Sequence, residues 1–249
     1  MTLHPVRWMA AMLCAAVMTW PVHAATQAAA QATNPPQTVQ AQYEVTLNGT
    51  PVGVMNDHYE ARDGRYRIVS ETHAVGVLAL VQRRPARVIS SGEVQATGLR
   101  PLSFEATRGN DSRRIGAEFD WNTRVLTLNH DGRSETLPLP AGAQDRLSAL
   151  YQFMFIGADR LRDISFAMTN GRKLDQYRYT LGSDSALDTP LGRMAVIHLV
   201  KRHAPGETAT EIWLARDRSL LPVKMRIIED DGSRYEQSLL KLDTGPAAP

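Results

Sequence analysis

Cysteine is almost absent from this 249-residue chain, and its single copy is Cys14. Cys14 lies in an apolar N-terminal stretch, so the remainder of the chain can form no disulfide, no thiolate metal site and no cysteine nucleophile. Leu13 directly precedes it, where a lipoprotein signal requires a small residue. The fold must therefore be stabilised by its apolar core alone.

An excess of either charge is also missing, since 28 Lys and Arg face 26 Asp and Glu. This balance gives no electrostatic argument for binding nucleic acid. Arg83, Arg84, Arg87, Arg113 and Arg114 stand among acids rather than on one helix face. A solvated strand face is the favoured interpretation of these arginines, and a phosphate or anionic-lipid patch is the alternative.

Catalytic and metal-binding motifs are lacking as well. The chain has no His-Glu-x-x-His pair, no Gly-x-Ser-x-Gly elbow and no phosphate-cradling glycine loop. Five histidines remain beyond residue 24, and none has a second histidine at the spacing that a zinc site often uses. His58 stands near Asp57 and Glu60, which leaves a metal site open, but a surface histidine is the default expectation. We predict no metal and no cofactor.

Four carboxylates on predicted strands are the remaining candidates for acid and base catalysis: Glu93, Glu118, Asp120 and Glu211. A catalytic pair would have to converge inside the fold, whereas strand carboxylates more often face water beside Lys or Arg. Asp120 precedes Trp121 and is better interpreted as a turn residue whose carboxylate bonds its own backbone. We therefore predict a non-enzymatic protein without catalytic residues.

Residues 1–24 have the features of a secretory signal peptide. Arg7 supplies the positive start, Trp8 to Trp20 is mostly apolar, and the segment ends in Val22-His23-Ala24, which fits the small-x-small cleavage rule. The apolar stretch is short for a membrane span. Residues 25–41 show no apolar period and contain a Pro pair, so we expect a disordered linker there.

Short runs of alternating apolar and polar residues fill the rest of the chain. Five Asn-Gly or Asp-Gly pairs separate them and mark hairpin turns: Asn48-Gly49, Asp63-Gly64, Asp131-Gly132, Asn170-Gly171 and Asp231-Gly232. We predict a single all-β, mainly antiparallel domain over residues 42–243 and a flexible tail at 244–249. A sheet with so many strands curls, so we expect a closed or half-open β-barrel meander.

The C-terminal stretch Glu211 to Leu242 is the most regular part of this pattern, and it predicts three adjoining antiparallel strands. Within it, Val223, Met225 and Ile227 alternate with two basic residues, which places the apolar set on one face. We expect these last strands to form the closing edge of the barrel, where they meet earlier strands.

One α-helix interrupts the strands near residues 145–156. Leu147, Leu150, Tyr151 and Met154 recur at helical spacing, and Asp145 provides a plausible N-cap. Gly157 can end the helix. A single amphipathic helix among strands is expected to cover one end of a barrel.

An apolar run from Ala74 to Val81 also departs from the alternation. The favoured interpretation is a buried strand or a loop at the bottom of the barrel, because short apolar runs between polar residues are usually core. The alternative is an apolar rim or lid that contacts an acyl chain or a partner.

The large apolar side chains of this run, of the helix and of the strands have two possible uses. They either fill the core, which is the general expectation, or line a cavity when the barrel is wide enough. The candidates for lining such a cavity are Val77, Leu78, Leu80, Phe104, Phe119, Tyr151, Met154, Phe155, Tyr179 and Trp213.

Several phrases in a fixed order resemble the exported family known as domain of unknown function 3108. They are Ser91-Gly92-Glu93, Gly98-Leu99-Arg100-Pro101 with Phe104, Phe119-Asp120-Trp121, Asp145-Arg146-Leu147-Ser148 with Tyr151, Thr189-Pro190-Leu191-Gly192, Trp213, Leu221-Pro222-Val223 and Asp231-Gly232. The resemblance covers most of the chain after Tyr43. It implies a periplasmic β-rich domain and no known reaction. The closing strands are also similar to the ends of half-barrel proteins that carry or sense lipoproteins in the periplasm.

Together these observations favour a periplasmic envelope protein that binds an amphipathic or apolar ligand, either a lipid or an acylated protein, in a β-barrel. An alternative is an adaptor domain with a filled core that binds an envelope protein through its surface. A third is a hydrolase of envelope polymers, which requires two inward carboxylates, or a carboxylate and a histidine, within hydrogen-bonding reach in a cleft.

Overall fold

The computed structural model describes residues 35–108, 114–204 and 206–245. Residues 1–24, predicted to be a signal peptide, lie outside this range, as do residues 25–34 of the expected linker. The fold begins with β1 (Thr38–Leu47), so the last four residues of that expected linker belong to a strand. The last strand, β16 (Arg234–Gly245), likewise takes in the first two residues of the expected tail. No helix among the described residues has the length and apolar character needed to span a bilayer.

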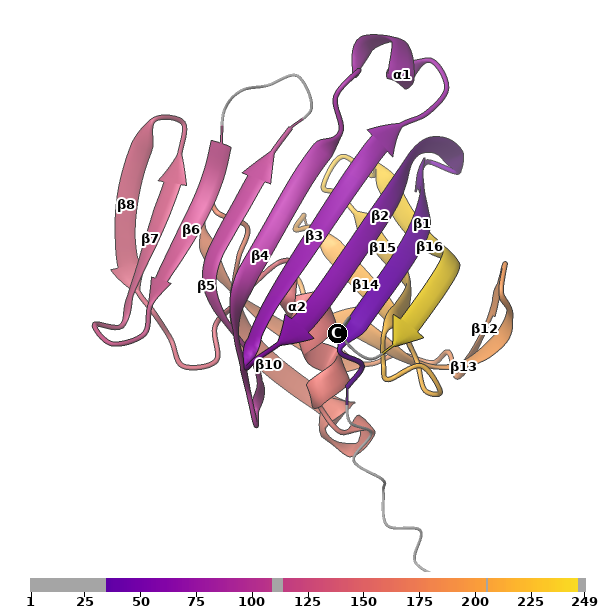
Figure 1. Ribbon diagram of the computed structural model, residues 1–249. Coiled ribbons are helices and arrows are strands. Elements are labelled where there is room, and N and C mark those ends of the chain that lie inside the picture. Colours follow the sequence, from indigo (N-terminus) through magenta and orange to yellow (C-terminus); the bar gives the residue numbers. More distant parts are fainter. Residues whose placement is uncertain (1–34, 109–113, 205, 246–249) are drawn as a thin grey trace, which may run out of the picture. The chain divides into compact units, whose positions relative to one another are not determined.

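The N-terminal half of the domain is an antiparallel meander in which each strand pairs with the next (Figure 1). Its strands after β1 are β2 (Thr50–Arg62), β3 (Arg65–Ala74), β4 (Ala86–Gln95), β5 (Gly98–Thr107), β6 (Arg114–Asp120), β7 (Val125–His130) and β8 (Arg133–Pro138). A short helix, α1 (Leu78–Val81), lies between β3 and β4.

The C-terminal half forms a second wall behind the first (Figure 1). It comprises β9 (Gln144–Asp145), α2 (Ser148–Gln152), the 3-10 helices η1 (Phe153–Phe155) and η2 (Ala158–Arg162), β10 (Asp163–Thr169), β11 (Leu174–Leu181), β12 (Ala186–Thr189), β13 (Gly192–Lys201), β14 (Ala209–Ala215), β15 (Pro222–Ile228) and β16. β12 pairs only with β13 and lies off the main path of the sheet.

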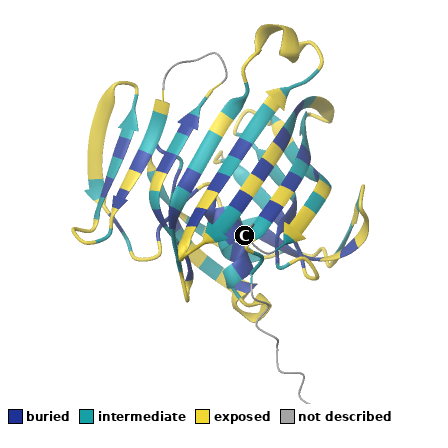
Figure 2. Cartoon of the chain, viewed as in Figure 1, coloured by how far each residue is buried: buried dark blue, intermediate teal, exposed yellow. Residues whose placement is uncertain are grey.

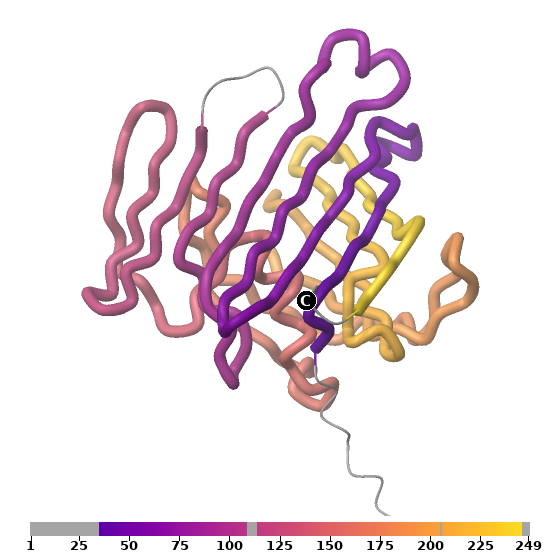
Figure 3. Tube along the Cα trace, in the orientation of Figure 1, coloured from indigo at the N-terminus to yellow at the C-terminus, as the bar shows by residue number. Residues whose placement is uncertain are grey.

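The two halves join through their first and last strands. β1 pairs antiparallel with β16, from Thr38 opposite Gly245 to Leu47 opposite Tyr235, so the indigo and yellow strands run side by side in Figure 3. The result is one 16-stranded sheet whose path ends at β8 and β9. The mainly antiparallel, half-open form of the prediction is confirmed, and the closed barrel is excluded. The C-terminal strands do meet the earliest one, but in the middle of the sheet rather than at its edge.

The five predicted turns connect neighbouring strands as expected. At Asn48-Gly49, Asp63-Gly64 and Asp131-Gly132 both residues have positive φ, which is the conformation of a type I′ hairpin turn. At the other two turns only the glycine has positive φ, and the preceding Asn170 or Asp231 accepts a backbone N–H through its side chain.

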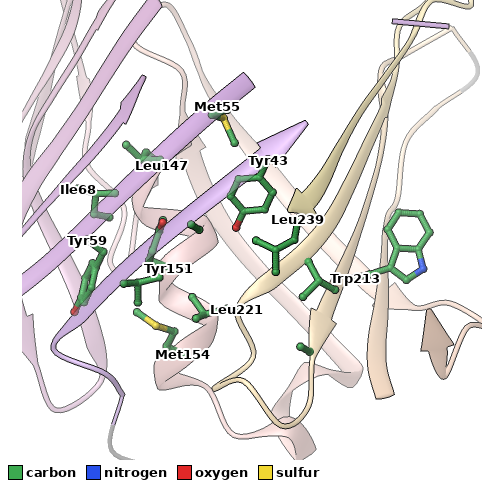
Figure 4. Close-up of a cluster of buried hydrophobic side chains, with 14 of the residues drawn as sticks. Tyr43, Met55, Tyr59, Ile68, Leu147, Tyr151, Met154, Trp213, Leu221 and Leu239 are labelled. Atoms are coloured by element: carbon green, nitrogen blue, oxygen red, sulfur yellow. The ribbon is translucent and has the colours of Figure 1, made fainter. Parts of the chain in front are cut away.

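The predicted helix is present but shorter than expected. Asp145 belongs to β9 and pairs with β10, and the α-helix spans only Ser148–Gln152 before it tightens into η1. The prediction that Asp145 is the N-cap is wrong, because the N-cap of α2 is Leu147, which makes no side-chain capping bond. The carboxylate of Asp145 nevertheless accepts the backbone N–H groups of Leu147 and Ser148. Figure 4 shows α2 between the two walls, with Tyr151 and Met154 packed among side chains from both.

The buried side chains form three clusters. The first joins β1 to β3 with α2 and includes Tyr43, Tyr59 and Tyr151 (Figure 4). The second lies under β5 to β8, around Phe104 and Leu128, and the third lies under β11, β13 and β14. Figure 2 shows the alternation of buried and exposed residues along β1 to β3, which is the period-two pattern of the sequence.

The apolar run Ala74 to Val81 is the clearest error in the predicted burial. Val77, Leu80 and Val81 are 78%, 76% and 73% exposed, and α1 has no buried residue. The run is therefore neither a buried strand nor a loop at the bottom of the barrel. It forms the projecting end of the β3–β4 hairpin, which matches the alternative expectation of an apolar rim.

Candidate functional site

A cavity of about 960 Å³ lies between the two walls of the half-barrel. Its apolar lining comes from β2, β4, α2, β10, β11, β14 and β15 and includes Met55, Val88, Leu147, Leu150, Phe153, Phe166, Tyr179, Ile212, Met225 and Ile227. The apolar set predicted on the strand of Met225 and Ile227 therefore faces the interior. Most of these side chains also pack in the first and third core clusters, and the space beside them is open, so the interior is not completely filled.

The cavity opens at one end of the strands and is covered by α2 at the other. Lys173, Lys201, Arg202, Glu207 and Asp230 line it where β10, β13 and β15 turn back into their neighbours. Thr72 and Ala86, paired across the ends of β3 and β4, line it on the opposite wall. These residues define the mouth of the cavity, which combines charged groups of both signs around an apolar interior.

Asp57 is an acid on the cavity wall, on the inward face of β2. It is 6% exposed, and its Oδ2 accepts a hydrogen bond of 3.3 Å from the hydroxyl of Tyr151 on α2. Its Oδ1 is buried without a hydrogen-bond partner in the described part of the chain. Burial raises the pKa of Asp57 to about 6, although donors from Ser70 and Tyr151 oppose this rise.

Asp145 is a second buried carboxylate, but its oxygens are satisfied. Oδ2 accepts a 2.6 Å bond from Ser90, and Oδ1 accepts the N–H groups of Leu147 and Ser148. The hydroxyl of Tyr66 lies 3.0 Å from Ser90 and extends this network. Burial raises the pKa of Asp145. We interpret Asp145 as the anchor that holds the start of α2 against β4, whereas Asp57 has spare hydrogen-bonding capacity.

Arg146 provides a cationic group on the cavity wall. Its guanidinium lies 5.9 Å from the ring centre of Phe104, and no described acid lies within ion-pair distance of it. A guanidinium without a carboxylate partner can donate to an anionic group that enters the cavity.

Side-chain hydrogen bonds, rather than backbone strand pairing, link β9 and α2 to β5 across the opening of the half-barrel. Gln144 donates from Nε2 to the carbonyl of Leu99, and Oε1 of Gln152 accepts the N–H of Leu99. Gln152 also donates to the carbonyl of Thr97. We call this contact the seam. It holds α2 and β9 on β5, so α2 stays over the end of the cavity opposite the mouth.

The ten lining candidates are dispersed in the structure, and of them Tyr179 lines the cavity. Tyr151 and Met154 belong to the first core cluster with Phe155 packed against it, and Phe104 and Phe119 belong to the second. Val77, Leu78 and Leu80 are exposed beyond the mouth. Residues such as Ile212, Met225 and Phe166 line the cavity instead, and only their inward position on alternating strands could have indicated them.

Trp213 is a buried member of the first core cluster, and its ring lies apart from the other labelled side chains in Figure 4. Its ring stacks on His198 at 4.4 Å, its N–H donates to Asp184, and Lys224 and Arg226 lie over the ring. This arrangement buries Trp213 outside the cavity.

The proposed catalytic carboxylates do not converge in the cavity. A shallow outer groove contains Glu93, Glu118 and Asp120, and Glu93 forms an ion pair there with Arg100. Asp120 accepts the N–H groups of Asn122 and Thr123, so Asp120 is the turn residue that was expected. Glu211 and His198 lie 2.8 Å apart but do not line the cavity. Asp57 and His58 lie on opposite faces of β2, and no group of three metal-binding side chains occurs in the described ranges.

Comparison with known structures identifies the architecture. The crystal structure of a β-barrel-like protein of the DUF1849 family from Brucella abortus matches with a TM-score of 0.54 and 13% identity, covering 84% of this chain and 98% of that one. At this identity the match shows a shared fold.

Two further structures are less similar. MucB matches with a TM-score of 0.36 and 12% identity, over 86% of this chain and 55% of its own. A lipoprotein candidate from Parabacteroides distasonis matches with a TM-score of 0.35 and 9% identity, over 84% of this chain and 97% of its own. Likeness at this level adds nothing to the fold assignment.

Sequence comparison gives the family. No protein with a curated description matches the chain. The family model described as "Protein of unknown function (DUF3108)" matches residues 42–239, which cover most of the β domain. This is the family that the sequence phrases resemble. The chain belongs to the DUF3108 family.

Proposed function

We propose that this protein is a non-enzymatic periplasmic protein that binds an amphipathic ligand, a lipid or the acyl chain of an acylated protein, in its half-barrel. The observation that carries the proposal is the cavity of about 960 Å³, which falls in the size range of small-molecule sites and is lined by apolar and polar side chains in roughly equal numbers. Its mouth accepts a chain end-on, and α2 closes the opposite end.

Arg146 supports a ligand with an acidic head group. Like Lys201 and Arg202 at the mouth, it lines the cavity without a described acid within ion-pair distance, and an anionic group placed beside it would form a charge-assisted hydrogen bond. The remaining wall offers apolar contact for a chain. The combination favours a fatty acid or another anionic amphiphile over a neutral hydrocarbon.

Displacement of a fluorescent fatty acid from the purified protein tests this proposal, and organic extraction followed by mass spectrometry identifies what the protein carries from the cell. We expect saturable binding at one site. Thr210 lines the cavity, so Thr210→Trp fills part of it and lowers the affinity by about tenfold or more. Thr136→Trp on the exposed edge strand β8 is the matched control and leaves the affinity unchanged.

Arg146→Met tests the head-group contact. The loss of a charge-assisted bond lowers the affinity for a fatty acid by about tenfold or more, while the affinity for the fatty alcohol of equal length stays within about twofold. Equal weakening for acid and alcohol would remove Arg146 from the site. No binding of either probe, and no co-purifying ligand, would refute ligand binding and favour the adaptor hypothesis.

A further inference from the structure

The projecting end of the β3–β4 hairpin gathers most of the exposed large hydrophobic side chains of the described protein. Seven such residues occur in the described ranges, and Val77, Leu78, Leu80 and Val81 are four of them. Residues 76–84 are all exposed, and we call this segment the α1 tip. Figure 2 shows it as a continuous exposed segment that projects from the end of the sheet.

These apolar side chains are not buried in the fold. α1 is a single turn with no side-chain cap and no buried residue. An exposed loop of a soluble domain is normally polar, and a contiguous exposed apolar patch usually marks a surface that binds something. The apolar residues of the α1 tip therefore point to a partner outside the chain.

The charges next to the patch restrict the kind of partner. Arg83 and Arg84 follow the apolar residues after Gln82 and belong to the exposed segment. Neither forms an ion pair with any described acid. An anionic membrane surface has a layer of phosphates above an apolar interior. Apolar side chains next to guanidinium groups match these two layers.

The shape of the α1 tip also favours a lipid surface over a protein groove. The tip is convex and protrudes from the end of the sheet (Figure 1), so a protein partner would need a matching groove, whereas a bilayer accepts any protruding apolar group. The turn at Glu229 to Asp231 lies at the same end of the strands and carries three acids. An anionic surface repels that turn, which orients the β3–β4 side towards the membrane.

We propose that the α1 tip inserts into the surface of an anionic lipid bilayer, with Val77, Leu78, Leu80 and Val81 below the phosphates and Arg83 and Arg84 bound to them. This docking brings the mouth of the cavity close to the membrane, because Thr72 and Ala86 at the mouth are on the two strands that carry the tip. The surface interaction does not depend on the ligand proposal, since it uses none of the residues that line the cavity.

Fluorescence from the tip itself gives a direct test. Cys14→Ser removes the single native cysteine, and Leu80→Cys then carries an environment-sensitive dye. Leu191→Cys is the matched control, since Leu191 is also an exposed leucine, at 45%, but precedes β13 at the opposite end of the strands. With vesicles of phosphatidylcholine and phosphatidylglycerol, we expect a blue shift and protection from aqueous quencher at position 80 only.

Vesicle flotation of full-length variants measures the energetic contribution. Leu80→Asp and the double variant Arg83→Ala/Arg84→Ala are each expected to weaken binding to anionic vesicles by about tenfold or more, and Leu191→Asp by less than about twofold. The double arginine variant should lose little affinity for pure phosphatidylcholine vesicles. Unchanged circular dichroism, expected for exposed positions, shows that the variants are folded.

Equal spectral shifts at positions 80 and 191, or tip variants that bind anionic vesicles as well as the unmodified chain, would overturn the proposal. The same result together with crosslinking from position 80 to one protein would assign the tip to a protein partner instead. Fatty-acid displacement by the tip variants in the absence of vesicles separates the two proposals. Loss of vesicle binding with normal displacement supports docking, whereas unchanged vesicle binding with normal displacement refutes docking and leaves ligand binding intact.

Discussion

Replacement of Asp57 by Asn should stabilise the protein at neutral pH but not at acidic pH. Burial raises the pKa of Asp57 from 3.8 to about 6. Well below pH 3.8 both the folded and the unfolded chain hold the proton, and the acid has no ionisation cost. As the pH rises from about 3 to 6 the unfolded chain releases its proton first, so the free energy of unfolding falls. The loss is complete about one pH unit above 6.

The rise in pKa of about two pH units corresponds to a loss of about 3 kcal/mol at 1.4 kcal/mol per unit. Asp57→Asn keeps the shape of the side chain and removes the charge. The variant should therefore gain about 2 to 2.5 kcal/mol on the unmodified chain at pH 8 relative to its difference at pH 4, where part of the loss has already occurred. Comparing the two pH values cancels any fixed effect of the new amide on hydrogen bonding.

Urea unfolding curves for both proteins at intervals from pH 4 to pH 8 measure this difference. Asp243→Asn, at an exposed carboxylate of β16, is the control. A pH-independent difference for Asp57→Asn would show that burial does not raise the pKa of Asp57. The fatty-acid affinity of the variant then shows whether the Asp57 carboxylate takes part in ligand binding.

Two further substitutions test the fold. Gly232 has φ of +82° and open space around it, so Gly232→Val should cost about 1 to 3 kcal/mol of stability through backbone strain alone. Gly232→Asn should cost less. Equal melting temperatures for the variants and the unmodified chain would show that the turn relaxes without strain. Ser90→Ala removes the donor to buried Asp145 and should lower the free energy of unfolding by about 1 to 3 kcal/mol. The control Ser91→Ala removes an exposed hydrogen bond with Ser103 and should change it by less than about 0.5 kcal/mol. Similar costs for both variants would argue against the anchoring role of Asp145.

Local features of this protein could be predicted from sequence because local chemistry specifies them. The Asn-Gly and Asp-Gly turns need positive φ, and the alternation of Val223, Met225 and Ile227 with basic residues needs one buried face, so hairpins and facing follow from neighbouring residues. The helix was longer in prediction than in the structure because Asp145 also pairs with β10, a contact between distant strands.

The cavity could not be predicted, since it depends on how far apart the two walls lie. Phe104 and Ile212 look alike in sequence, as large apolar residues on alternating strands, yet Phe104 is buried under β5 to β8 and Ile212 lines the cavity. Asp57 looked like an ordinary strand acid, because its burial follows from α2 packing against β2. The burial expected for Ala74 to Val81 was wrong because the expectation rests on a rule for most apolar runs, and here Val77, Leu78, Leu80 and Val81 are exposed.

The pairing of β1 with β16 has a consequence for how the domain is assembled. These strands stand at opposite ends of the chain, with Thr38 opposite Gly245, so almost the whole domain must be synthesised before β1 can fill its second edge. Closing so long a loop is entropically costly and makes folding slow compared with a local meander. Until β16 arrives, the free edges of β1 and β15 can pair with other chains. A chain cut before Arg234 would carry both edges permanently and is expected to aggregate, whereas a circular permutant that links the adjacent ends at Thr38 and Gly245 would make this late contact a local one.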